Sequence, residues 1–568
     1  MTLKNRKFLR PQRHAAWLLA ALFCCASSSR ADLARGNRGI VASVSPIASQ
    51  AGLDALKSGG NAIDAAVAMG VTLGVVDGYN SGIGGGCFML IHRANGEIIA
   101  LDGREMAPLT ATRDMFVRGG KGDTNLSQTG ALASGVPGSV AVYESALKRF
   151  GRKKLADLLL PSARIAESGF PLSANYARRL GSAAADLKKF DASRAIFFRP
   201  DGTPLGEGDT LRQTDLANSY RALAAQGSKW FYRGEYARLA GDWMQKNGGL
   251  ITAQDFARYQ MKERQPITTT YRGFKVVSFP PPSSGGVHVA QILNILENFP
   301  LAKLSDAGRH HVIAEAMKLA FADRAFWLGD PDYARVPRGL VDASYGRDLA
   351  RRIQLSAATP VPTHGTPPDF DQWVFEKHTT HFSAADAQGN WVACTATINT
   401  GFGSKVIVPG TGILLNNQMD DFSIQPGVPN AFGLVGSDAN AVAGGKRPLS
   451  SMSPTLVLRG RTPILSLGAA GGPTIISSTV QNLIGVLDLG LPLDAALAQP
   501  RLHQQWAPDE IRIEKAMPDA IKRALVARGH RLDEVNSIAV AQIVGLDPSG
   551  TGFVGAADPR AAGIASGF

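Results

Sequence analysis

Two strand-like segments joined by a three-residue loop constrain the fold of this chain more than any other feature. Residues 379–386 (TTHFSAAD) and 390–400 (NWVACTATINT) both have the pattern of β-strands, and Ala387-Gln388-Gly389 lies between them. A three-residue hairpin loop often places glycine where the backbone needs a positive φ. We therefore expect an antiparallel hairpin, centred on the glutamine of the loop, in which Thr379 faces Thr397.

This register gathers polar side chains at the open end of the hairpin. Opposed residues have Cβ atoms about 5 Å apart, and successive side chains alternate between the two faces of a strand. Thr379, Thr397 and Asn399 should therefore converge, with His381 and Ser383 on the same face as Thr379. By itself the pattern is only a polar strand end, because threonine is common in strands.

Other segments predict a protein that mixes helices and strands. Residues 62–75 are alanine-rich and apolar on nearly every side, which predicts a buried helix, and residues 311–327 predict a long amphipathic helix. Residues 82–86 (GIGGG) lead into an apolar strand at 87–91. They are not a dinucleotide fingerprint, because the third required glycine is a cysteine and the order is helix, loop, strand. Close backbone packing is the better interpretation. Residues 357–378 lack periodicity and are rich in proline and threonine, which predicts an exposed connecting segment.

The N-terminus has the features of an export signal. Basic residues up to Arg13 precede an apolar stretch at 15–26, and Ser29-Arg30-Ala31 forms a small-x-small cleavage site. We therefore expect residues 1–31 to be a signal peptide, Asp32 to begin the mature chain, and the protein to be periplasmic or secreted. The apolar stretch is shorter than the roughly 20 residues that span a membrane, so no stable membrane span is expected and an uncleaved anchor is the weaker alternative.

Charge and composition exclude several classes of protein. Residues 1–31 carry six basic and no acidic residues, so the net charge of +13 falls to +7 in the mature chain. This excess is modest, and the densest basic run, at 148–154, contains one aromatic residue, so a solvated helix end is favoured over a nucleic-acid site. With 45% hydrophobic and 19% charged residues, the chain is an ordinary globular protein and not a disordered, collagenous or coiled-coil one.

The cysteines predict neither a disulfide framework nor a metal site. Cys24 and Cys25 leave with the signal, and the large residues before Cys24 disfavour a lipoprotein. Cys87 and Cys394 remain, too few for a disulfide framework, with a bridge between them as the less favoured alternative. Cys394 lies in an apolar strand, which favours a buried small hydrophobe over a nucleophile. The i, i+4 pair at 311 and 315 lacks a third ligand, so no metal site is expected.

A series of ordered motifs resembles the γ-glutamyltransferases, also called γ-glutamyltranspeptidases. In the C-terminal part the motifs are 379–383 (TTHFS), 397–400 (TINT), 412–423 (GILLNNQMDDFS), 446–455 (KRPLSSMSPT) and Gly471-Gly472. In the N-terminal part they are 84–86 (GGG), 102–108 (DGREMAP), 135–138 (GVPG) and 280–286 (PPPSSGG). Order and spacing agree from about Gly36 to Phe568. The resemblance implies an α+β fold of the N-terminal nucleophile hydrolase type, an αββα sandwich made from one autoprocessed precursor.

The resemblance also implies how the chain is cut. The Thr379 hydroxyl attacks the preceding carbonyl, and cleavage of the His378–Thr379 bond releases the amino group of Thr379. A free α-amino group has a pKa near 7.7–8, so it can act as a base beside the hydroxyl of the same residue. Residues 32–378 would become the large subunit and residues 379–568 the small, catalytic subunit. The two would form a heterodimer derived from one chain.

The same resemblance assigns roles to the other site residues. Thr397 orients Thr379, and the N–H groups of Gly471 and Gly472 stabilise the oxyanion. A γ-glutamyl group ends in a zwitterion, whose recognition needs a cation and an anion with hydrogen-bonding partners. The implied carboxylate-binding residues are Arg104, Ser450 and Ser451, and the implied ammonium-binding residues are Asp421, Gln418 and Asn399. Glutathione is the expected donor and water or an amino acid or peptide amine the acceptor, with no cofactor.

The sequence departs from the family pattern at a few positions. Cys87 stands where many family members continue the glycine run, Gly103 replaces the aromatic residue that often precedes the arginine, and residues 77–81 lack the usual proline. The segment 426–441 has the glycine, proline and asparagine of an ordered exposed loop, and by resemblance it is a lid over the site. Some family members close this lid through a tyrosine, and here the matching residue is Phe432, whose ring can offer only apolar contact.

Three other functions are the alternatives to this one. A glutaryl-cephalosporin acylase has the same fold, but a glutaryl group has no ammonium to meet Asp421. A poly-γ-glutamate hydrolase of the same fold is the second alternative. A catalytically inactive binding protein is disfavoured because Thr379, Thr397 and Gly471-Gly472 are intact.

Overall fold

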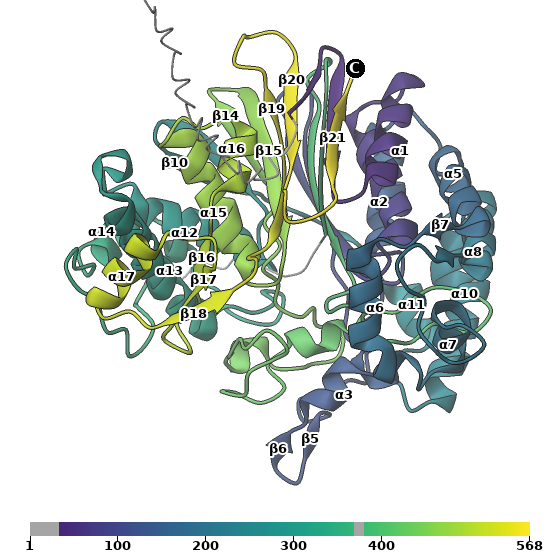
Figure 1. Ribbon diagram of the computed structural model, residues 1–568. Helices are drawn as coiled ribbons and strands as arrows, with labels where there is room; N and C mark the ends of the chain where they lie inside the picture. The colour runs from purple at the N-terminus through teal and green to yellow at the C-terminus, as the bar shows by residue number, and fades with distance from the viewer. Residues whose placement is uncertain (1–32, 369–379) are drawn as a thin grey trace, which may run out of the picture.

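The computed structural model describes residues 33–368 and 380–568. The predicted signal peptide and the predicted cleavage site at His378–Thr379 lie outside these residues. Two seven-stranded antiparallel sheets stack face to face at the centre of the molecule, and helices cover the outer face of each (Figure 1). This is the αββα arrangement that the sequence analysis predicted.

The strands of both sheets come from distant parts of the chain. In order across the first sheet they are β1 (Ala34–Gly36), β20 (Phe553–Ala557), β19 (Val540–Leu546), β15 (Thr462–Ala470), β14 (Thr455–Arg459), β11 (Phe274–Ser278) and β10 (Ile267–Tyr271). In the second they are β21 (Ile564–Gly567), β2 (Gly39–Ser43), β12 (Thr380–Asp386), β13 (Trp391–Thr397), β3 (Gly86–His92), β4 (Ile98–Gly103) and β9 (Lys262–Arg264). Each sheet therefore contains strands from before and after residue 379.

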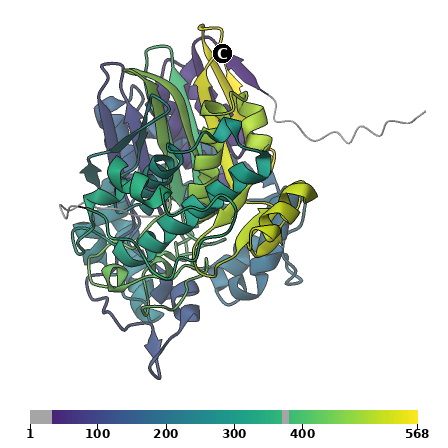
Figure 2. The ribbon, with the colours of Figure 1, turned by 90° about the vertical axis from the view of Figure 1, so that its left-hand side faces the viewer.

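Helices on the two sides give the outer layers. Those against the second sheet include α1 (Pro46–Lys57), α2 (Ala62–Val76), α4 (Ser139–Phe150) and α5 (Leu155–Ser168). Those on the side of the first sheet include α12 (Ser284–Leu296) and α15 (Thr474–Leu487), with α13 (Asp306–Trp327) packed on α12. Figure 2 shows the teal helices of this second group in front of their sheet. Between the sheets Phe88 stacks on Phe279 with ring centroids 4.2 Å apart, so the inner faces form a packed apolar layer.

Shorter elements surround this core. The remaining helices are α3 (Thr124–Gln128), α6 (Ala174–Leu187), α7 (Asp191–Phe197), α8 (Thr214–Gln226), α9 (Ser228–Arg233), α10 (Glu235–Lys246), α11 (Ala253–Arg258), α14 (Ala343–Ala350), α16 (Leu493–Ala498) and α17 (Asp519–Ala527). The remaining strands are β5 (Val117–Arg118), β6 (Lys121–Gly122), β7 (Phe170–Pro171), β8 (Thr210–Leu211), β16 (Leu502–Gln504), β17 (Ile511–Glu514) and β18 (Leu532–Val535). In the described ranges no helix combines the length and the apolar character needed to cross a membrane.

The predicted hairpin register is confirmed for the described residues. Strands β12 and β13 are antiparallel, and Thr380 pairs with Ala396 and Ala385 with Trp391, as a loop centred on residue 388 requires. Gly389 has a φ of 93°, the conformation that the loop needs. His381 Nδ1 lies 3.0 Å from Thr395 Oγ1 on the opposite strand. The register of the hairpin therefore determines which residues lie at its open end.

Two predicted element bounds change for local reasons. The helix expected at 311–327 begins at Asp306, because the Ser305 side chain accepts a hydrogen bond from the Gly308 N–H, 3.2 Å away, and so caps an earlier start. The strand expected to reach Thr400 ends at Thr397, because Asn399 takes a left-handed conformation with a φ of 77°. The described part of the segment 357–378 has neither helix nor strand, as predicted.

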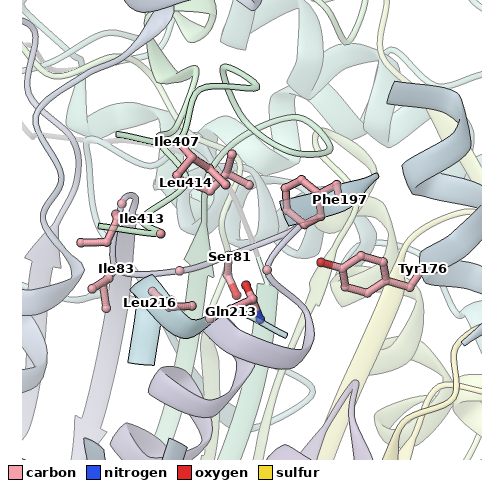
Figure 3. Close-up of a pocket in the computed structure, with 14 residues that line it drawn as sticks. Ser81, Ile83, Tyr176, Phe197, Gln213, Leu216, Ile407, Ile413 and Leu414 are labelled. Atoms are coloured by element: carbon pink, nitrogen blue, oxygen red, sulfur yellow. The ribbon is translucent and has the colours of Figure 1, made fainter. Parts of the chain in front are cut away.

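A small internal cavity lies behind the loop between α2 and β3 (Figure 3). The hydroxyls of Ser81 and Tyr176 line it, and neither has a hydrogen-bond partner among the described residues. Its volume of about 20 Å³ and these two unpaired hydroxyls suit a single buried water molecule. None of the predicted site residues lines it, so this cavity is not the candidate site for a substrate.

Candidate active site

Thr397 and Asn399 lie at the open end of the hairpin, where β13 leaves the sheet. Thr397 is fully buried, and its Oγ1 accepts a hydrogen bond from the Asn399 N–H at 2.7 Å. Asn399 Nδ2 donates to the Asn417 carbonyl at 3.0 Å, whereas its buried Oδ1 has no partner in the described ranges. The Thr397 hydroxyl can therefore still donate its own proton, and Asn399 Oδ1 can still accept one.

The glycine run packs directly beneath this strand end. A Cβ on Gly85 would lie 1.8 Å from the Thr397 carbonyl oxygen, and a Cβ on Gly84 would lie 2.0 Å from the Leu414 carbonyl oxygen. No side chain fits at such distances, so only glycine allows the two backbones to approach. The interpretation of GIGGG as a close-packing segment is confirmed, and its effect is to fix the position of Thr397.

Arg104 and Asp421 form a buried ion pair beside the hairpin end. Arg104 Nη2 lies 2.6 Å from Asp421 Oδ2, and both side chains are fully buried. Gln418 Nε2 donates to the same carboxylate oxygen at 2.9 Å, and Arg104 Nε donates to the Pro448 carbonyl at 3.3 Å. The two charges that were predicted to bind opposite ends of a ligand thus contact each other. A bound zwitterion would replace this contact, with its carboxylate on Arg104 and its ammonium on Asp421.

Ser450 and Ser451 lie on a loop that the segment 280–286 holds in place. The Ser284 N–H donates to the Ser450 carbonyl at 2.9 Å, and the Ser450 N–H donates to the Pro282 carbonyl at 3.1 Å. The Met452 N–H donates to Ser450 Oγ at 3.2 Å. Ser451 Oγ is buried and has no hydrogen-bond partner among the residues that the structure describes. Its hydroxyl is therefore available to a ligand.

Gly471 and Gly472 connect the end of β15 to the start of α15. Their φ values are 140° and 61°, conformations that residues with a side chain rarely adopt. A Cβ on Gly471 would lie 2.6 Å from Thr474 Oγ1. The N-terminus of α15 follows at once, and the unpaired N–H groups and dipole of a helix N-terminus favour negative charge. The backbone here is suited to stabilising an oxyanion.

Phe432 packs on this glycine pair. A Cβ on Gly472 would lie 2.7 Å from Phe432 Cδ1, so the ring covers Gly472. The neighbouring Ala431 N–H donates to Asp420 Oδ2 at 2.9 Å, and Ser127 Oγ donates to the other oxygen of Asp420 at 2.6 Å. Burial raises the pKa of Asp420 to about 6. The segment 426–441 is mostly loop, with one short 3₁₀ turn at Asp438–Asn440 that the sequence did not predict.

Glu105, which follows Arg104 in the motif at 102–108, is a further buried residue of the site, and its role is not evident from the sequence. Its side chain is fully buried, and its Oε2 lies 3.4 Å from Arg104 Nη1. A Cβ on Gly86 would lie 2.6 Å from the same oxygen, so Glu105 fills the space between Arg104 and the strand that pairs with Thr397. Burial raises the pKa of Glu105 to about 7, opposed by the charge of Arg104. Its position next to Arg104 was the only feature of the sequence that could have indicated a place for Glu105 in the site.

We expect Glu105→Gln to change how the stability of the protein depends on pH. A carboxyl whose pKa rises from 4.5 to about 7 on folding binds its proton more tightly in the folded state, so its contribution is fully present below pH 4.5 and is lost as the pH rises through 7. The glutamine variant cannot lose this contribution. Melting temperatures measured from pH 4.5 to 7.5 should therefore fall less for the variant than for the parent. Parallel curves would contradict the shifted pKa.

Cys87, Cys394 and His311 are the residues that the sequence excluded from a disulfide framework, a nucleophile and a metal site. Cys87 and Cys394 are both free and buried, and burial raises the pKa of the Cys394 thiol. His311 Nδ1 lies 2.7 Å from His530 Nε2, and its Nε2 lies 2.7 Å from the Gln354 carbonyl oxygen, so both ring nitrogens are occupied. Residues 33–368 and 380–568 contain no group of three or more His, Cys, Asp or Glu side chains arranged to hold a metal ion.

Known proteins are similar to this chain in sequence and in fold over nearly its whole length. Residues 48–568 match the family model described as gamma-glutamyltranspeptidase. The chain is 45% identical over 536 residues to a glutathione hydrolase proenzyme of Escherichia coli K12, covering 93% of this chain and 91% of that protein. A crystal structure of cephalosporin acylase from Bacillus halodurans superposes with a TM-score of 0.84 at 29% identity and covers 99% of both chains.

A solved structure of a gamma-glutamyltranspeptidase is also similar to this chain. The Helicobacter pylori gamma-glutamyltranspeptidase is 44% identical, with a TM-score of 0.55, and the match covers 56% of this chain and 92% of that chain. The family model, the near full-length relative and the four-layer architecture agree. The chain therefore belongs to the gamma-glutamyltranspeptidase family.

Proposed function

We propose that the protein is an autoprocessed γ-glutamyl transferase and hydrolase that cleaves glutathione and other γ-glutamyl amides. The observation that carries this proposal is the buried Arg104–Asp421 pair, 2.6 Å apart, beside the end of the hairpin. A cation and an anion in one buried site match the carboxylate and the ammonium of a γ-glutamyl group. The names of the relatives support the same activity, because glutathione is a γ-glutamyl peptide.

Maturation begins with the Thr379 hydroxyl. Its oxygen attacks the His378 carbonyl carbon, the His378–Thr379 C–N bond breaks, and the resulting ester is hydrolysed by water to a new carboxylate and the restored hydroxyl. The free α-amino group then lies on the nucleophile itself. The proposed large subunit is 32–378 and the proposed small subunit 379–568. Because both sheets contain strands from before and after residue 379, the two subunits would stay together as a heterodimer.

Catalysis then follows as acyl transfer. The Thr379 hydroxyl attacks the γ-carbonyl carbon of the donor while the α-amino group takes its proton. The Gly471 and Gly472 N–H groups stabilise the oxyanion, the C–N bond breaks, and the proton passes to the leaving amine. Water or an amine attacks the ester in the second half of the reaction and frees Thr379. These steps need only the groups of this chain and its substrates.

Donor recognition assigns one subsite to each charge. Arg104 turns from Asp421 to the donor carboxylate, together with Ser450 and the unpaired hydroxyl of Ser451. The ammonium takes the place of Arg104 beside Asp421, with Gln418 and the unpaired Oδ1 of Asn399 as acceptors. A glutaryl-cephalosporin acylase activity is the second candidate, because the cephalosporin acylase from Bacillus halodurans has the same fold over nearly the whole chain. The buried Asp421 disfavours it, since a glutaryl group would leave this carboxylate unmatched.

The N-terminal segment completes the proposal. A cleavable signal at residues 1–31 would export the enzyme to the periplasm or the medium. The test of the whole proposal has two measurements on the purified mature protein. Mass spectrometry should find a new N-terminal threonine, and γ-glutamyl p-nitroanilide should be cleaved faster when a dipeptide acceptor is added. An uncut chain that is inactive on this substrate would overturn the proposal.

Thr397→Ala should slow both maturation and acylation by about 10- to 100-fold. The hydroxyl lies at the strand end and accepts from Asn399 N–H, which leaves its proton free to orient Thr379, and a hydrogen bond near a charged group is worth about 1.5–3 kcal/mol. Thr397→Ser keeps the hydroxyl and should retain much of both rates. Precursor conversion on gels and single-turnover kinetics measure the two steps. Unchanged rates in the alanine variant would reject this role.

Phe432→Ala should open the site to bulky donors and acceptors. We expect kcat/KM for these substrates to rise by roughly three- to tenfold. The ring covers Gly472, so its loss removes apolar contact that holds the segment 426–441 closed. Phe432→Tyr adds a hydroxyl that can meet the unpaired Asn399 Oδ1, and it should slow exchange. Kinetics with short and long γ-glutamyl peptides decide between these effects. If the size dependence is unchanged in both variants, Phe432 is not the latch.

A further inference from the structure

Arg324 is a buried cation whose role the proposed mechanism does not use. It lies on α13 and is 3% exposed. Its Nε donates to Ser284 Oγ at 3.2 Å, and in the described ranges no carboxylate lies within ion-pair distance of its guanidinium. The adjacent Asp323 is bonded instead to Tyr345 and Gln291. A buried guanidinium without a direct ion-pair partner is costly, which suggests that its position serves a function.

The contact of Arg324 leads directly to the Ser450–Ser451 loop. Ser284 Oγ accepts from Arg324 and donates to the Ser450 carbonyl oxygen, to which the Ser284 N–H also donates, at 2.9 Å. The peptide between Ser450 and Ser451 therefore has its carbonyl fixed toward Ser284. Because a trans peptide points its N–H away from its carbonyl, the Ser451 N–H faces the opposite side of the loop.

Ser451 has the character of an anion subsite. Its hydroxyl is buried without a hydrogen-bond partner in the part of the chain that the structure describes. A carboxylate would satisfy this donor, as buried polar groups require. Arg324 acts through Ser284 to orient the peptide between Ser450 and Ser451, and so positions Ser451.

Charge balance gives Arg324 a second effect on the same subsite. Arg104 faces two buried carboxylates, Asp421 and Glu105. Above the raised pKa of Glu105, about 7, both are ionised and these three groups carry one net negative charge. The charge of Arg324, which acts on Asp421, brings the set to neutrality. The other titratable groups that face Arg324 are His288 and His503, which stay neutral because burial lowers their pKa values to about 3 and about 4. Arg324 therefore favours an incoming carboxylate.

We propose that Arg324 is a positioning residue that determines specificity for the donor carboxylate, by holding the Ser450 carbonyl through Ser284 and by balancing the charge of Asp421 and Glu105. The proposal rests on the function proposed above and adds a residue outside the direct ligand contacts.

The test compares Arg324→Gln, Arg324→Lys and Ser284→Ala in the processed enzyme. For Arg324→Gln, we expect the KM for γ-glutamyl p-nitroanilide to rise about 10- to 100-fold while kcat changes less than about threefold. The inhibition constant of glutarate, which has the carboxylates but no ammonium, should rise by a similar factor. Arg324→Lys keeps the charge and should recover most of the affinity, and Ser284→Ala should give a smaller shift of the same kind.

Two results would overturn this role. One is an unchanged KM and an unchanged inhibition constant in both Arg324→Gln and Ser284→Ala. The other is a fall in kcat or in precursor processing at constant KM, which indicates a purely structural role. If Arg324→Gln does not fold, the Ser284→Ala variant decides by the same criteria. Failure of the proposed function is distinguishable, because then the parent protein itself lacks the new N-terminal threonine and does not cleave γ-glutamyl p-nitroanilide.

Discussion

Thr379→Ala should give a single uncut chain without γ-glutamyl transferase or hydrolase activity. The variant lacks the oxygen that attacks the His378 carbonyl and, later, the donor, so one change removes both maturation and acylation. We expect the loss to be complete within detection, because no second group of the chain is proposed to replace a covalent nucleophile. Denaturing gels and intact mass spectrometry measure the cut, and release of p-nitroaniline measures the activity.

Two variants are the matched controls for this experiment. Thr379→Ser keeps a hydroxyl at the same position and should still be cut. Thr380→Ala changes the next residue, whose Oγ1 donates to Asp77 Oδ2 at 3.2 Å, and it should be cut because it leaves the proposed nucleophile intact. Cleavage of purified Thr379→Ala at the same bond would mean that a foreign protease makes the cut.

The hairpin shows what local pattern can predict. Alternation and a glycine-ended loop are sufficient to fix which residues oppose one another, and the described pairs from Thr380–Ala396 to Ala385–Trp391 follow that register. The predicted end of β13, at Thr400, was wrong by three residues. The strand stops earlier because the left-handed turn at Asn399 follows from contacts with Asn417 and with the loop after α2. Such contacts join residues far apart in the chain and leave no periodic signal.

The ion pair of the site illustrates the limit more clearly. Arg104 and Asp421 are 317 residues apart in sequence and 2.6 Å apart in space, and no spacing rule joins them. The family resemblance identified both residues as members of one site but not their mutual contact. Glu105 and Arg324 were missed because a buried charge is defined by its surroundings, which come from both sheets and α13. A charged residue in a helical or loop pattern otherwise predicts a solvated face.

Asp421→Asn should separate γ-glutamyl from glutaryl substrates. An asparagine cannot form the ion pair with a buried ammonium, and breaking such a pair costs about 3–5 kcal/mol, which corresponds to a roughly 100- to 4000-fold loss in kcat/KM. The same change frees Arg104 from its contact at 2.6 Å and so makes it available to a carboxylate. We therefore expect glutaryl p-nitroanilide, which lacks the ammonium, to be cleaved at least as well as by the parent. The ratio of the two kcat/KM values is the measurement.

Asp420→Asn is the matched control, because Asp420 is also a buried carboxyl but its partners are Ser127 and Ala431. Its loss loosens the segment 426–441, which covers the site for either substrate, so both rates should change by a similar factor and their ratio should stay constant. Asp421→Asn must differ from this control in the ratio. If Asp421→Asn lowers kcat/KM for both substrates by the same factor, Asp421 serves only to hold Arg104. The preference for a γ-glutamyl donor then arises from Asn399 and Gln418 instead.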